Sequence, residues 1–237
     1  KADVVILSVL KTQSDVGLYG APYKLIDAIT TFAMMFMGLI LPIMAAAWAK
    51  KDIERFKLVF QKTLNMLIIF IVPMVIGTYF VAKNIMIFIA GSDFADSGKI
   101  LIILVLGAGA LFLGSLFAHT IVAIDKQKTV LWGYAIDAIL SLIGYFIFIP
   151  RYSYIGAAWV TVFSESFIAI FSLWIVIKYA KIIPKSLKIF IKSVLASIPM
   201  AIALYFLKNY HVVISLVTAT AVYSVFIILF KGITLEE

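Results

Sequence analysis

Two carboxylates inside long apolar segments are the side chains with the clearest chemical potential. Asp137 lies about eight residues into one segment, and Glu165 lies about eleven residues into the next. In antiparallel helices rising 1.5 Å per residue, both carboxyls fall near the middle of a bilayer core about 30 Å thick. Acids at such depth are rare and mark ion or substrate pathways. The pair therefore favours transport or proton or sodium coupling, unless neighbouring hydroxyls such as Ser141 merely cap each acid.

Three further ionisable residues extend this candidate site. Asp3 belongs to a short apolar run, and completing that helix upstream would place Asp3 well inside a membrane. It is therefore a third candidate for transport or ion coupling. Lys24 and Asp27 lie three residues apart on one predicted helix face, so they either line a substrate cavity together with Ser141 or form a local ion pair.

The remaining chemistry-bearing residue types exclude several kinds of site. The chain has no cysteine, so disulfides, thiolate metal sites and cysteine nucleophiles are excluded. His119 and His211 are too far apart in sequence to suggest a metal motif. No glycine-rich phosphate loop or nucleophile elbow is present. We therefore expect no enzyme activity, no cofactor and no metal.

The composition identifies the elements that must position these residues. Of 237 residues, 64% are hydrophobic and 14% are charged, and the mean hydropathy is +1.13. A soluble domain carries about 25% charged residues. An integral membrane protein follows, and continuously apolar segments favour helices over a barrel. The fold class is an all-α polytopic bundle with seven full spans, predicted at residues 23–48, 63–82, 100–123, 129–149, 154–177, 189–207 and 212–230.

The charge pattern predicts the orientation of these spans. The net charge is +8, and most basic residues fall in alternate connections, at residues 50–62, 126–128 and 178–192, and after the last span. Basic loops mark the cytoplasmic side, so the C-terminus should be cytoplasmic. The same clustering argues against nucleic-acid binding. At the opposite side, Tyr145, Tyr152, Tyr154 and Trp159 suggest an interfacial aromatic belt.

Two local features qualify this bundle. Residues 83–99 are too short to span and suggest a short interfacial helix followed by a polar turn at residues 91–98. Because the chain begins at Lys1 and its first apolar run is short, we expect a truncated first helix and a longer parent protein.

Three stretches in order carry a family resemblance. They are ADVVILSVLKTQSDVGLYGAPYKL at residues 2–25, IFIAGSDFADSGKILIIL at residues 87–104 and IPRYSYIGAAWVTVFSE at residues 149–165. Together they resemble the C-terminal half of the polysaccharide and O-antigen flippases of the multidrug/oligosaccharidyl-lipid/polysaccharide exporter superfamily. Asp3 and Glu165 match family positions by motif, whereas Asp137 does not align with a family signature.

The resemblance implies a fold and a function. Residues 1–180 would form the second-half bundle, and residues 181–237 would add two helices and a short cytoplasmic tail. The implied function is flipping of undecaprenyl-diphosphate-linked oligosaccharide repeat units across a bacterial or archaeal cytoplasmic membrane for O-antigen, capsule or exopolysaccharide synthesis. Alternating access with proton or sodium coupling would drive it. Partners would be the lipid-linked oligosaccharide, membrane lipids and other polysaccharide-assembly membrane proteins.

Two other classes stay open. A related exporter of drugs or of another lipid precursor would share this architecture, and more acids in the cavity would favour drugs. A membrane enzyme acting on lipid-linked sugars would need a large outer loop with catalytic residues, and the longest outer connection has about 17 residues.

Overall fold

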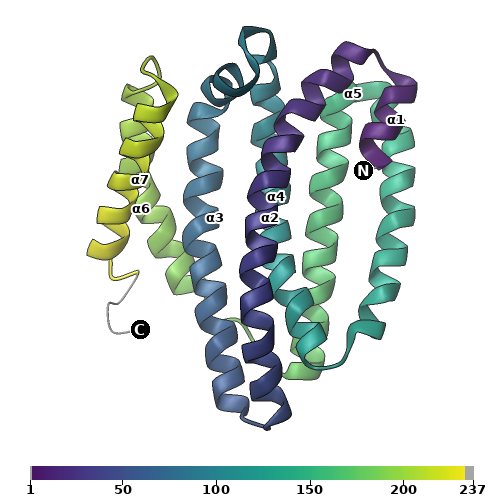
Figure 1. Ribbon diagram of the computed structural model, residues 1–237, viewed down its shortest axis with the longest axis vertical. Coiled ribbons are helices and arrows are strands. Elements are labelled where there is room, and N and C mark those ends of the chain that lie inside the picture. Colours follow the sequence, from purple (N-terminus) through teal and green to yellow (C-terminus); the bar gives the residue numbers. More distant parts are fainter. Residues whose placement is uncertain (1, 233–237) are drawn as a thin grey trace.

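The computed structural model describes residues 2–232, and this part of the chain is an all-α bundle, as predicted (Figure 1). Six of its helices are long and apolar enough to cross a membrane. In chain order, the elements are α1 (Ala2–Leu10), α2 (Gln13–Ala49), α3 (Ile53–Ala90), the 3-10 helix η1 (Ser92–Phe94), α4 (Ser97–Ala123), α5 (Gln127–Ala180), α6 (Leu187–Phe206) and α7 (Val212–Leu229). Residues 233–237, which include most of the predicted tail, lie outside the described residues.

Helix α5 contains two of the predicted spans. Its 54 residues bend back at Ser153, whose φ of 49° and ψ of −136° are non-helical. Pro150 lies just before this corner, and a Cβ at Gly156 would come within 2.5 Å of the carbonyl oxygen of Phe148. Only glycine fits so close to the incoming backbone. The two arms of α5 are therefore antiparallel neighbours (Figure 1).

Two predicted boundaries were wrong. Helix α2 begins at Gln13 rather than near residue 23, because Thr12 caps it by accepting from the backbone N–H of Asp15 at 3.3 Å. The expected separate interfacial helix at residues 83–90 is the end of α3, which runs unbroken to Ala90. Gly91, with a φ of 97°, ends α3, and the polar turn predicted after it contains η1.

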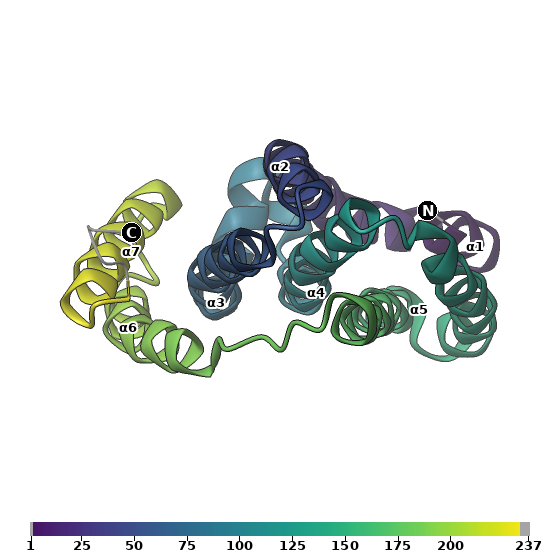
Figure 2. The same cartoon turned by 90° about the horizontal axis from the view of Figure 1, so that it is seen from below.

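Small residues let the central helices pack closely. Helix α4 contacts α2, α3 and α5, and Figure 2 shows it in the middle of the molecule. A Cβ at Gly107 would lie 3.5 Å from Val162, and one at Gly114 would lie 3.4 Å from Ala169. The second arm of α5 therefore lies against α4 along a glycine-containing face, as expected for membrane helices.

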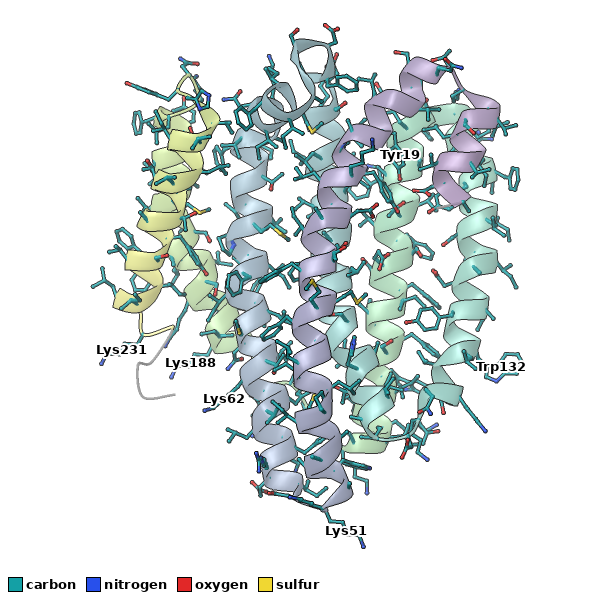
Figure 3. The ribbon with its side chains drawn as sticks, viewed as in Figure 1. Tyr19, Lys51, Lys62, Trp132, Lys188 and Lys231 are labelled. Carbon is teal, nitrogen blue, oxygen red and sulfur yellow. The ribbon has the colours of Figure 1, made fainter. Side chains whose placement is uncertain are left out.

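The last two helices form a pair at one edge of the bundle. Helices α6 and α7 pack on each other and on α3, away from α1 and α5 (Figure 2). Lysines from different elements gather at one end of the molecule, and Figure 3 labels Lys51, Lys62, Lys188 and Lys231 there. Tyr19 lies toward the opposite end (Figure 3). This common basic end agrees with the charge alternation read along the sequence.

Candidate functional site

Asp3 is a buried carboxylate with a specific partner. Only 2% of Asp3 is exposed, and its Oδ2 accepts a hydrogen bond of 2.8 Å from the hydroxyl of Tyr19. Tyr19 is itself fully buried and comes from the N-terminal part of α2. The turn between α1 and α2 thus brings an acid and a phenol together, and Lys11 in this turn donates to the carbonyl of Pro150 at 3.0 Å.

A line of hydroxyls continues from Tyr19 into α5. The hydroxyls of Tyr19 and Tyr145 each lie 3.3 Å from Oγ1 of Thr161. These contacts are longer than the usual O–H···O distance and therefore weaker than the bond to Asp3. Tyr145 comes from the first arm of α5 and Thr161 from the second, so this set of side chains links α1, α2 and both arms of α5.

The two acids predicted to share a site, Asp137 and Glu165, lie on the two arms of α5. The hydroxyl of Ser164 donates to Oδ2 of Asp137 at 2.7 Å, and Ser141 donates to Oδ1 at 3.4 Å. Glu165 follows Ser164 and lies within electrostatic range of Asp137. Both acids are half-buried. The sequence left two alternatives open, an acid capped by hydroxyls and a pair of interacting acids. The structure contains both, because hydroxyls cap Asp137 and Glu165 lies within its electrostatic range.

The remaining candidates lie on α2, one turn apart. Lys24 is exposed and Asp27 is half-buried. The backbone carbonyl of Asp27 accepts from the hydroxyls of Thr30 and Thr31 at 3.1 and 2.7 Å. The side-chain pair and its place in a substrate cavity stay predictions.

The sequence did not predict the hydrogen bond of Tyr19 to Asp3 or the hydroxyls of Thr161 and Tyr145 that follow it. Tyr145 was expected in an aromatic belt, but it is 7% exposed and hydrogen-bonded to Thr161, so that assignment was wrong. Tyr152 and Trp159 are exposed, as an interfacial belt requires. One signal was available for Thr161: it lies one helical turn before Glu165 and so shares a face with it. Nothing in the sequence brings Tyr19 to Asp3, because a turn between helices decides that contact.

An apolar groove lies on the side of α2 and α4 that faces α3, α6 and α7, away from the polar cluster. Its volume is about 710 Å³, and α2, α3, α4, α6 and α7 all contribute to its walls. Its lining is almost wholly apolar and includes Ile69, Pro73, Met200, Leu204 and Tyr223. The site residues described above do not line this groove, so the polar cluster and the groove are separate features.

Comparisons with known proteins agree with this architecture. A family profile described as "Polysaccharide biosynthesis protein" matches residues 1–99. Over 165 residues, covering 68% of this chain and 34% of the relative, the sequence is 25% identical to the "Probable low-salt glycan biosynthesis flippase Agl15" of Haloferax volcanii. The structure superposes on "Lipid II flippase MurJ, inward closed conformation", with a TM-score of 0.72 and 20% identity, covering 97% of this chain and 52% of that one.

These matches differ in how much of each protein they cover and in the kind of likeness they show. The chain spans only about half, or less, of the length of the relatives that it matches. The structural likeness concerns the fold, whereas the profile and the archaeal relative concern the sequence itself. The resemblance inferred from the sequence motifs is confirmed: the sequence is similar to polysaccharide-biosynthesis proteins and to a glycan-biosynthesis flippase, and the fold is similar to that of a lipid II flippase.

Proposed function

We propose that the protein containing this chain flips undecaprenyl-diphosphate-linked oligosaccharide repeat units from the inner to the outer leaflet for surface polysaccharide synthesis. In this proposal, residues 1–180 form one half of an alternating-access transporter, and residues 181–237 add a helix pair and a cytoplasmic C-terminus. The membrane is the cytoplasmic membrane of a bacterium or an archaeon. The protein acts as a transporter, and the chemistry of its substrate is left unchanged.

One arrangement carries the proposal. The polar cluster around Asp3, Tyr19 and Thr161 lies between α1, α2 and α5, whereas the apolar groove lies toward α3, α6 and α7. A lipid-linked sugar has the same division, with a hydrophilic headgroup and a long hydrocarbon chain. Moving the headgroup across about 30 Å of hydrocarbon requires polar groups inside the membrane, while the chain needs an apolar surface.

The acids extend the proposal to a driving force. Asp137 and Glu165 lie on the two arms of α5, and Asp3 is buried in α1. Intramembrane carboxylates of this kind form proton and ion relays in transporters. We propose coupling to protons or sodium ions through these three acids. The name of the archaeal relative, a glycan-biosynthesis flippase, supports the same substrate class.

A deletion experiment tests the function. The gene is deleted in its native host, and surface polysaccharide and the cytoplasmic-leaflet pool of the lipid-linked repeat unit are measured. Loss of polysaccharide with accumulation of the repeat unit, cured by the wild-type gene, is the expected result. If precursor and polysaccharide stay at wild-type levels in a host without a sister flippase, the proposal is wrong.

The role of Glu165 is tested in the same host. Glu165→Gln keeps the size of the side chain and removes its charge, and Glu54→Gln at the exposed start of α3 is the matched control. At equal expression, we expect export to fail with Glu165→Gln and to persist with Glu54→Gln. Full export with Glu165→Gln would leave this acid a structural role only.

A drug exporter is the second candidate. The two neighbouring acids Asp137 and Glu165 are the feature that favours it, because carboxylates attract cationic compounds. Resistance of the deletion strain to cationic dyes and drugs decides this candidate. Lower resistance with unchanged precursor levels would replace the flippase proposal.

A further inference from the structure

Pro73 leaves a carbonyl without its usual partner in the middle of α3. Proline has no backbone N–H, so the carbonyl four residues earlier, that of Ile69, has no donor within the helix. In hydrocarbon, no water is present to take its place, and an unpaired carbonyl is unfavourable. A helix is also free to bend at such a point.

Helix α7 supplies the missing donor. The hydroxyl of Tyr223 donates to the carbonyl oxygen of Ile69 at 2.8 Å, across 154 positions of sequence. Tyr223 is 7% exposed and packs in an apolar cluster with Val81, Met200 and Leu204. A phenol thus reaches the one carbonyl that Pro73 frees, from a helix that packs directly on α3.

The α6–α7 pair is also tied to α3 on both sides of this contact. Toward one end, Nδ2 of Asn84 donates to the carbonyl of Lys208 at 2.9 Å. Toward the basic end, Nε2 of Gln61 donates to Oγ of Ser186 at 2.8 Å, and the backbone N–H of Lys185 donates to Oε1 of Gln61 at 3.0 Å. Hydrogen bonds therefore connect α3 to the segments at both ends of α6. Tyr223 adds a further hydrogen bond to α3, one helical turn before Pro73.

The apolar groove includes this contact. Ile69, Pro73 and Tyr223 all line it. A molecule in the groove would therefore touch both the flexible point of α3 and the hydroxyl that restrains it.

We infer that Tyr223 is a positioning residue, which supplies from α7 the hydrogen bond that Pro73 removes from α3. It restrains α3 at this point and thereby sets the wall of the groove. The two halves of α3 then move together with α6 and α7. Any use of this restraint in lipid transport rests on the proposed function, but the restraint itself does not.

Distance measurements between spin labels test the restraint. Because the chain has no cysteine, Lys57→Cys and Lys83→Cys place two labels on exposed positions on either side of Pro73 without background labelling from this chain. The complete gene product is labelled in lipid nanodiscs, without substrate. Four proteins are compared in this background: wild type, Tyr223→Phe, Pro73→Ala and the double variant. Tyr205→Phe, an exposed tyrosine of α6, is the matched control.

The proline makes the test specific. Tyr223→Phe should broaden the distance distribution, raising the ratio of bent to native-like molecules about threefold, the effect of an average side-chain hydrogen bond in a membrane protein. With Pro73→Ala, the new N–H of residue 73 binds the Ile69 carbonyl. Tyr223→Phe should then have no effect, and Tyr205→Phe should have none in either background.

Two results would overturn the inference. One is an unchanged distribution for Tyr223→Phe, and the other is the same broadening with and without Pro73, which would mean that the ring packs but the hydroxyl restrains nothing. If Tyr223→Phe alone is poorly produced, Pro73→Ala should restore its production, and failure to do so counts against the inference. Since no substrate is present, failure of the flippase proposal in the deletion experiment is a separate result.

Discussion

The hydroxyl of Ser97, at the start of α4, donates to the carbonyl oxygen of Leu18 in α2 at 2.8 Å. Leu18 lies four residues before Pro22, so this is the carbonyl that Pro22 leaves without a helical donor. Ser97 is fully buried. The same relationship joins Tyr223 to Ile69 before Pro73. At these two prolines, a hydroxyl from another helix replaces the missing N–H, as is known for prolines in membrane helices.

The Ser97 contact predicts a loss of stability that depends on Pro22. Ser97→Ala should lower the free energy of unfolding by about 0.6 kcal/mol, and by about 1.7 kcal/mol at most. In a Pro22→Ala background, the N–H of residue 22 satisfies Leu18, and the effect should vanish. Thermal unfolding in detergent measures both, with exposed Ser14→Ala as the control. An equal loss in the two backgrounds would show that Ser97 acts in some other way.

The buried Asp3–Tyr19 pair predicts a larger effect. Tyr19→Phe removes the 2.8 Å hydrogen bond and leaves the Asp3 carboxyl buried without that donor. We expect a loss of roughly 1–3 kcal/mol in unfolding free energy. Tyr152→Phe, on an exposed ring, should change stability by less than about 0.5 kcal/mol.

A double-mutant cycle separates the bond from the ring. Tyr19→Phe should destabilise less in an Asp3→Leu background, because no polar atom of residue 3 is then left unpaired. A loss of the same size in both backgrounds would assign the effect to packing of the ring at position 19.

The corner of α5 predicts a steric effect at Gly156. A Cβ there would approach the backbone oxygen of Phe148 at 2.5 Å, so Gly156→Ala must push the two arms apart. We expect a loss of about 1–3 kcal/mol, measured by thermal unfolding. Gly38→Ala in α2 is the matched control, since a methyl group there would meet no atom within 4 Å, and it should leave stability unchanged or raise it by up to about 1 kcal/mol. Equal behaviour of the two variants would contradict the tight corner.

The connection between α5 and α6 predicts a change in protease sensitivity. Gln61 holds this connection through the backbone N–H of Lys185 and the hydroxyl of Ser186. Gln61→Leu removes both bonds, so trypsin should cut after Lys181 and Lys185 several-fold faster, as local opening becomes easier. Gln127→Leu, at an exposed position, is the control. Unchanged cleavage would mean that packing alone holds the connection.

The spans were predictable because their signal is local. Length and continuous hydrophobicity of about 20 residues suffice to identify a crossing, and the seven predicted segments coincide with α2, α3, α4, the two arms of α5, α6 and α7. Helix ends were less accurate. The start of α2 and the end of α3 depend on Thr12 and Gly91, and a composition window does not resolve single capping residues.

The acids of the candidate site were also predictable from the sequence, but most of their hydrogen-bond partners were not. Asp3, Asp137 and Glu165 stand out in the sequence because a carboxylate in hydrocarbon is unfavourable without a partner. Ser141 was within reach of local reasoning, since it lies one helical turn after Asp137, whereas Ser164 bonds to Asp137 across 27 positions of sequence and only the packing of the two arms brings them together.

The sequence alone determined the class of the protein, its long apolar segments, the basic end and the acids that need partners. Those properties follow from the composition and from the positions of apolar and charged residues along the chain. Only the tertiary structure decided that Tyr19 donates a hydrogen bond to Asp3 and that α6 and α7 line an apolar groove. It also decided that Ser97 and Tyr223 donate to the carbonyls that Pro22 and Pro73 leave without a helical donor. These contacts join distant segments, and a hydrogen bond forms only where helix packing brings donor and acceptor within about 3 Å.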